Sequence, residues 1–118
     1  MKGVEQMPKI YVNQSITKTG DGEFTADCRC YDEGLRELFA FERDYTHATL
    51  TYTGYNALFT ALDRAWQTIG ARGVEVRLKS NCRPLVADIE RQRLDGSLGR
   101  ILAAKIEQYG MSIEAEQL

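Results

Sequence analysis

The sequence has 118 residues, which is the length of one domain, and we expect a single domain over residues 1–118. Hydrophobic residues make up 43% of the chain and charged residues 27%, a balance that excludes a disordered or fibrous protein. Fifteen Lys and Arg stand against seventeen Asp and Glu, and the resulting net charge of -2 excludes the overall basic field of most nucleic-acid binders, leaving at most a local basic patch.

The first part of the chain predicts three strands. Apolar and polar residues alternate over Lys9–Thr17, over Glu23–Tyr31 and over Leu35–Tyr45, and this period of two is typical of strands that bury one face. Glycine-containing turns at Thr19–Gly22 and Asp32–Gly34 separate them. Three consecutive strands with short turns indicate an antiparallel meander.

The pattern then changes to helical spacing. Apolar residues from Leu58 to Ile69 recur at the three- and four-residue intervals of an amphipathic helix. Thr53 or Gly54 is the predicted start of this helix, and Gly70 or Gly73 its end.

A strand over Val74–Leu78 follows. A second helix begins close after it, because Ser80 or Asn81 suits an N-cap and Pro84 suits the first turn. A third helix runs from Leu98 to Tyr109, with Ser97 as its predicted cap and Gly110 after its end, and residues 111–115 alternate as a last strand. The whole pattern predicts an α/β fold: a five-stranded mixed sheet, with the antiparallel meander plus parallel strands, and about three helices.

The sequence favours a cytoplasmic protein without a membrane segment. Its longest uncharged run, Ala48–Leu62, is interrupted by polar residues, whereas a span needs ~20 mostly apolar residues, and the N-terminus lacks the apolar stretch of a secretory signal. Cys28, Cys30 and Cys82 are an odd number of cysteines, which favours reduced thiols. We interpret them as small packing residues.

Three segments, in this order, resemble the ribonuclease H family. Lys9–Ser15, with the sequence KIYVNQS, resembles the family's first strand, which usually ends in Tyr-x-Asp-Gly-Ser. Tyr55–Leu62 lies where the family's first helix carries an Ala-Glu-Leu run, and Val74–Cys82 is similar to the fourth strand and its Ser-Asp-Ser ending. The likeness covers residues 8 to 116 and implies a ribonuclease H-like fold.

The resemblance also implies an activity that this sequence lacks the residues to support. The family cleaves RNA in RNA–DNA hybrids with two divalent cations ~3.5–4 Å apart, held by carboxylates on the first strand, on the first helix and after the fourth strand. At these positions the sequence has Asn13, Ala57 and Asn81. It also lacks the family's last helix and catalytic-loop histidine, and we interpret its one histidine, His47, as structural.

We therefore expect a catalytically inactive member of the fold, a pseudoenzyme without a cofactor, in which divalent-metal binding is weak or absent. The alternative is an active metal-dependent ribonuclease whose carboxylate ligands come from other positions. For Asn81 we favour a structural role as the cap of the second helix over a relic site, and for Asn13 the sequence does not decide between the two roles.

Two kinds of partner are open to an inactive module. Lys18, Tyr55, Lys79 and Arg83 are the candidate residues for nucleic-acid binding, through phosphate contacts and stacking on bases. Because no helix follows the last strand, its apolar residues are candidates for a homodimer or for binding another protein, and the alternative is that the third helix covers them. These residues are Met111, Ile113 and Ala115.

Overall fold

The computed structural model describes residues 8–118, and residues 1–7, part of the segment searched for a secretory signal, lie outside this range. The order of elements predicted from the sequence is confirmed, with three strands, a helix, a strand, two helices and a strand. The elements are β1 (Lys9–Gly20), β2 (Glu23–Tyr31), β3 (Glu37–Tyr45), α1 (Leu50–Ile69), β4 (Glu75–Ser80), α2 (Arg83–Glu90), α3 (Ser97–Tyr109) and β5 (Ser112–Gln117).

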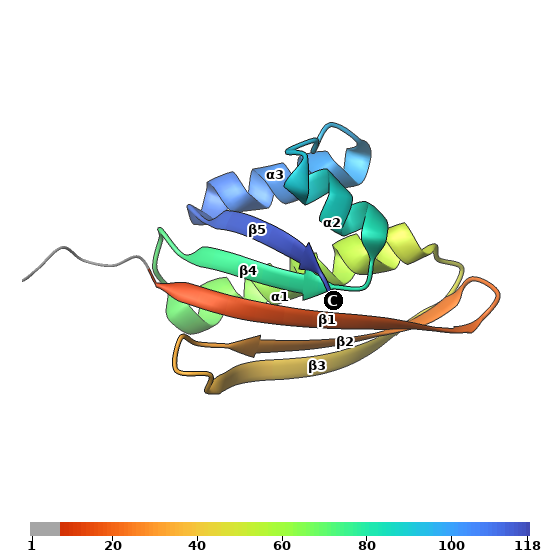
Figure 1. The fold of residues 1–118 in the computed structure, drawn as a ribbon, viewed down its shortest axis with the longest axis horizontal. Helices are drawn as coiled ribbons and strands as arrows, with labels where there is room; N and C mark the ends of the chain where they lie inside the picture. The colour runs from red at the N-terminus through yellow and green to blue at the C-terminus, as the bar shows by residue number, and fades with distance from the viewer. Residues whose placement is uncertain (1–7) are drawn as a thin grey trace, which may run out of the picture.

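The strands form one mixed sheet in the order β3-β2-β1-β4-β5 (Figure 1). β1, β2 and β3 pair antiparallel, as a meander with short turns must, whereas β4 and β5 add to β1 in parallel. α1 is the crossover between β3 and β4 and packs against β1 and β2, and α2 packs against β4 and β5. β1 is therefore the central strand, with the antiparallel half of the sheet on one side and the parallel half on the other.

One face of the sheet carries the core, and the other is open. Along β1, Val12, Gln14 and Ile16 are buried beneath the helices, whereas Asn13 and Ser15 are exposed. The same alternation continues in β4, whose buried residues are register partners of the buried residues in β1, and in β5, whose half-buried Ile113 and Ala115 are register partners of buried Val76 and Leu78. All three helices thus cover the same face of the sheet.

Ion pairs between neighbouring strands occupy much of the open face. Such a face is stable in water without a covering helix, because its side chains are polar and its charges are matched in rows. The pairs across β4 and β5 are Arg77 with Glu114 at 3.5 Å and Lys79 with Glu116 at 3.3 Å, and the pair between β1 and β4 is Lys9 with Glu75 at 3.8 Å.

Two element boundaries differ from the sequence prediction. α1 begins at Leu50, because the side chain of Thr49 accepts the amide of Tyr52 as an N-cap, so Thr53 and Gly54 lie inside the helix and are buried. β3 begins at Glu37 because Leu35 has a left-handed φ of 64°, which a continuous strand does not allow. The predicted end of α1 at Gly70, with φ 65°, is confirmed.

The starts of the other two helices also move by one or two residues. Cys82, rather than Ser80 or Asn81, is the N-cap of α2, and its side chain makes no cap hydrogen bond. Gly96 rather than Ser97 caps α3. Pro84 in the first turn of α2 and the left-handed Gly110 after α3 are confirmed.

The core lies between α1 and the sheet. Its largest fully buried side chains include Tyr55, Leu58 and Leu62 of α1, packed over the central strands. Cys28, Cys30 and Cys82 are free thiols buried in the same core, which confirms their role as packing residues. None of the helices in residues 8–118 is long and apolar enough to cross a membrane.

Candidate functional site

The middle of β1, the first turns of α1 and the end of β4 meet at one buried polar cluster. The Gln14 side-chain amide donates to the carbonyl oxygen of Gly54 at 2.9 Å. The Ser80 hydroxyl donates to the side-chain oxygen Oε1 of Gln14 and accepts the backbone amide of Cys82 at 3.0 Å. Three elements that are distant in the sequence are therefore joined by neutral hydrogen bonds. We call Gln14, Gly54 and Ser80 the neutral cluster.

The neutral cluster is closed to solvent. The side chains of Gln14 and Ser80 are 0% exposed, and every buried side-chain nitrogen or oxygen among residues 8–118 has a hydrogen-bond partner. A buried amide or hydroxyl is stable when it is paired and costly when it is not, so this cluster is a satisfied part of the core.

Close packing between α1 and α2 seals the cluster. A Cβ atom at Gly54 would lie 2.5 Å from the Cys82 sulfur and 2.9 Å from the Cys82 Cβ. Both distances are far below van der Waals contact, so only glycine allows this approach of the helices. The position has no room for a carboxylate side chain.

The three positions named from the resemblance do not come together in the structure. Asn13 is exposed on the open face, between Arg29 of β2 and Lys79 of β4, and Ala57 is fully buried on α1. The residue of β1 that points toward α1 is Gln14, because neighbouring residues of a strand point to opposite faces. The available signal was the apolar row Ile10, Val12 and Ile16, which places position 14 on the buried face.

Asn81 bridges two strands and does not cap a helix. Its side-chain oxygen accepts the backbone amide of Ile16 at 2.8 Å, and its side-chain nitrogen donates to the Ile16 carbonyl oxygen, also at 2.8 Å. The amide side chain thereby reproduces the two hydrogen bonds of a strand partner just beyond the end of β4. The prediction that Asn81 caps α2 is wrong.

Replacing Asn81 with aspartate distinguishes a role as the N-cap of α2 from a role as the bridge to Ile16. At an N-cap aspartate is as favourable as asparagine, whereas in the bridge it loses the donor and places a carboxylate against the Ile16 carbonyl oxygen. We expect N81D to lower the free energy of unfolding by about 1–2 kcal/mol, measured by urea denaturation at neutral pH. An unchanged or higher stability would contradict the bridge.

The donors in the neutral cluster do not fit the divalent cations that the resemblance implies. Magnesium and similar ions require several anionic oxygens, and this cluster offers an amide, a hydroxyl and a backbone carbonyl that are already bonded to one another. Within residues 8–118 no group of three or more His, Cys, Asp or Glu side chains could hold a metal ion.

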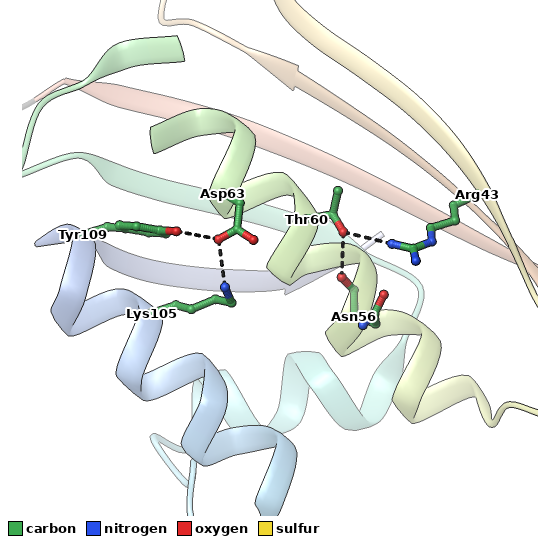
Figure 2. A network of polar contacts seen from close by, with 6 residues as sticks. All are labelled: Arg43, Asn56, Thr60, Asp63, Lys105 and Tyr109. Carbon is green, nitrogen blue, oxygen red and sulfur yellow. Dashed lines mark hydrogen bonds and ion pairs between the residues drawn. The ribbon is translucent and has the colours of Figure 1, made fainter. Parts of the chain in front are cut away.

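The one carboxylate on α1 is engaged elsewhere. Asp63 accepts hydrogen bonds from Lys105 at 2.8 Å and from Tyr109 at 2.6 Å, both on α3 (Figure 2). The Tyr109 ring also stacks on Trp66 of α1 with ring centroids 5.0 Å apart. Asp63 therefore fastens α3 to α1, two turns along the helix from the neutral cluster. A second polar link in Figure 2 joins β3 to α1, where Arg43 donates to Thr60 at 3.4 Å.

The four residues predicted to bind nucleic acid do not form one surface. Tyr55 is 2% exposed and donates from its hydroxyl to Asp88 of α2 at 2.5 Å, so stacking on a base is excluded, and that part of the prediction is wrong. Burial, helped by Asp88, raises the pKa of the Tyr55 phenol. Lys79 lies on the open face paired with Glu116, Lys18 lies near the hairpin tip beside Asp21, and Arg83 is exposed at the start of α2.

The residues predicted for a protein interface on β5 face the helices. Met111 is buried, and Ile113 and Ala115 are half-buried against the core. β5 exposes Glu114 and Glu116 on the open face, and Ser112 and Gln117 at its two ends. Met111 is therefore covered by the helices and Ile113 and Ala115 are covered in part, and the binding of another copy or another protein at β5 stays a prediction.

His47 lies exposed in the loop between β3 and α1, with a left-handed φ of 52°. Of the two tyrosines beside this loop, Tyr45 is buried and Tyr52 is 43% exposed. Tyr45 donates to Asn56 at 2.9 Å, and Tyr52 packs edge-on against Tyr45 with ring centroids 6.2 Å apart.

Alkaline pH should destabilise the fold through its buried thiols. Burial raises the pKa of Cys28 from 9.0 to about 12, against a smaller opposing effect of its hydrogen bond with Gln14, and burial likewise raises the pKa of Cys30 to about 12. The unfolded chain therefore releases these protons at lower pH than the folded chain. The contribution of the two protonated thiols to the free energy of unfolding is complete below about pH 9, and it is lost as the pH rises toward 12.

Urea denaturation at a series of pH values from neutral to about 10.5 tests this expectation. The double variant C28A/C30A should show a smaller loss of stability over the same range. Equal slopes for the variant and the natural chain would contradict the role of the thiols.

The strand order and the position of α1 on the sheet define a ribonuclease H-like fold. Several solved RNase H structures share this fold. LC11-RNase H1 in complex with an RNA/DNA hybrid has a TM-score of 0.78 at 15% identity, covering 92% of this chain and 84% of its own. The N-terminal RNase H domain of rv2228c from Mycobacterium tuberculosis, solved as a fusion with maltose binding protein, has a TM-score of 0.75 at 17% identity, covering 94% and 82%. RNase H1 from the halophilic archaeon Halobacterium salinarum has a TM-score of 0.64 at 15% identity, covering 92% and 86%.

The likeness is one of fold. A scan against protein-family models finds no match, and no curated protein is significantly similar in sequence. Since the identities to these three structures are 15–17%, the shared fold leaves the function to be argued from this chain's own residues.

Proposed function

We propose that this chain is a catalytically inactive ribonuclease H-like module that acts by association and not by cleavage. The observation that carries the proposal is the neutral cluster, which fills the meeting point of β1, α1 and β4 with paired, fully buried groups. Two-metal cleavage of a phosphodiester needs carboxylates that hold both cations and leave room for water and substrate. The cluster supplies neither the charge nor the space.

A cleavage assay tests the proposal. The RNA strand of an RNA–DNA hybrid is labelled, and the hybrid is incubated with excess protein and Mg²⁺ or Mn²⁺, beside a competent ribonuclease H as positive control. We expect the labelled strand to stay intact under conditions in which the control cleaves it. Metal-dependent cleavage that follows the protein through purification would contradict the proposal and favour relocated carboxylate ligands.

Association with another protein is the mode of action that the sheet supports best. β5 lies at one edge of the sheet and, among residues 8–118, pairs only with β4, so its other side can accept a further strand. We place this module in the cytoplasm, because its three cysteines are free thiols in the structure.

A second candidate function is nucleic-acid binding without cleavage. Its support is a group of exposed arginines at the α2–α3 connection, namely Arg91, Arg93 and Arg100, none of which forms an ion pair with another residue in 8–118. Unpaired guanidinium groups are suited to phosphate contacts. Fluorescence anisotropy with labelled hybrid should then show salt-sensitive binding that the triple variant R91A/R93A/R100A loses.

A further inference from the structure

The free edge of β5 presents the backbone of alternate residues. The amides of Ser112 and Leu118 donate to Val74 and Ser80, so even-numbered residues of this strand turn their backbone groups toward β4. Successive residues of a strand turn to opposite sides. The N–H and C=O groups of Ile113, Ala115 and Gln117 therefore point away from the sheet, where a further strand would bond to them.

A groove runs beside this edge on the helix face. It has a volume of about 490 Å³ and lies between β5, α3 and the end of α2. Its apolar lining comes from Ile89, Leu94, Ala103 and Ile113. A strand added to β5 would point every second side chain along this face, so the groove is placed to receive apolar side chains.

The opposite face of the edge is acidic. Rows of charge cross the parallel half of the sheet from Arg77 to Glu114 and from Lys79 to Glu116, and each row ends in a glutamate at the edge. The two carboxylate side chains are 73% and 64% exposed, respectively. A Lys or Arg on an added strand would place a positive charge beside Glu114 or Glu116. Opposite charges on neighbouring strands attract, so this pairing is favourable.

We propose that the β5 edge binds an extended segment of another protein as a sixth strand of the sheet. The segment alternates apolar side chains, which enter the groove, with Lys or Arg side chains, which lie beside Glu114 and Glu116. This inference rests on the proposed role in association and names the chemistry of the partner.

The same charges oppose pairing of two copies through this edge. In a two-fold antiparallel pairing of β5 with itself around Ala115, Glu114 of one copy lies opposite Glu116 of the other, and like charges in direct opposition are unfavourable. Pairing of β5 with the free edge of β3 brings the glutamates toward Glu42 and Asp44, which are also exposed acids. The two glutamates that end these rows at the edge are also unfavourable for the phosphates of nucleic acid.

Two fluorescein-labelled peptides test the proposal by anisotropy with the full chain. The first alternates lysine and valine, and the second is a matched control that alternates glutamate and valine. We expect saturable binding of the lysine peptide and at least about tenfold weaker binding of the glutamate peptide. On binding, amide hydrogen exchange should slow at Ile113, Ala115 and Gln117, and not at other exposed amides.

Two variants locate the binding. A115P removes an outward N–H that β4 does not use, so we expect about fivefold weaker binding of the lysine peptide with the sheet intact. The charge reversal E114K/E116K should invert the preference between the two peptides. Circular dichroism and a thermal melt of each variant confirm that the fold is kept.

The inference would be overturned by no binding of the lysine peptide, by equal binding of both peptides, or by binding that A115P and the charge reversal leave unchanged. Its failure is distinct from that of the proposed function, which fails only if the chain cleaves the hybrid. Displacement of the lysine peptide by hybrid would assign the edge to nucleic acid and would also overturn it.

Discussion

Replacement of Gln14 with alanine should lower the free energy of unfolding by about 3–5 kcal/mol. The fully buried amide is the partner of both the Gly54 carbonyl and the Ser80 hydroxyl, so its removal leaves two buried polar groups unpaired and opens a cavity in the centre of the sheet. Urea denaturation at neutral pH, followed by circular dichroism, measures the loss.

The neighbouring residue provides a matched control. Asn13 is one position away on the same strand but is exposed on the open face, so N13A should change the stability by no more than about 0.5 kcal/mol. A loss for N13A as large as that for Q14A would show that the two faces of β1 are assigned the wrong way round.

Replacement of Gly54 with alanine should cost about 2 kcal/mol, although alanine is the better helix former by about 1 kcal/mol. The added Cβ would lie 2.5 Å from the Cys82 sulfur, so α1 and α2 must separate at the neutral cluster. Since Cys82 is the N-cap of α2, where glycine is acceptable, C82G removes the obstructing side chain without loss of the helix start.

The double variant G54A/C82G should therefore be more stable than the sum of the two single losses predicts, by about 1–2 kcal/mol. A double-mutant cycle in urea measures this coupling. Additive losses would mean that contact between Gly54 and Cys82 does not limit the approach of the helices.

The sequence was sufficient for the fold because its local signals agree. The period-two alternation before Tyr45, the helical spacing from Leu58 and the glycines at 70 and 110 each correspond to the element observed. The starts of the helices were less well predicted. The first turn of α1 contains Thr51 and Tyr52, which carry little helical signal, and the Cys82 cap forms no side-chain cap hydrogen bond that a sequence pattern could indicate.

The candidate site was predicted by element but not by residue. The resemblance pointed to β1, α1 and the end of β4, which meet at the neutral cluster, whereas Asn13 lies on the open face and its neighbour Gln14 on the buried face, because successive residues of a strand point to opposite faces. The bridge made by Asn81 to Ile16 and the closeness of Gly54 to Cys82 join residues far apart in the sequence. No local pattern reports such contacts, because they depend on how the elements pack.

The neutral character of the cluster is consistent with the proposed loss of the chemistry while the fold is kept. Buried Gln14 and Ser80 satisfy each other, so the centre of the sheet needs no bound cation to neutralise a group of carboxylates. The neutral cluster stabilises the junction of β1, α1 and β4. In the proposed function, the β5 edge of the sheet then serves for association with another protein.

Titration of ¹⁵N-labelled protein with Mn²⁺, followed by NMR, tests the central claim most directly. Bound Mn²⁺ broadens the signals of nuclei around it, and the side-chain amide of Gln14 and the backbone amide of Gly54 report on the neutral cluster itself. We predict that these signals persist while weak broadening is confined to surface carboxylates. Selective, saturable loss of the Gln14 and Gly54 signals would show a metal site where we find a closed neutral cluster, and would contradict the account.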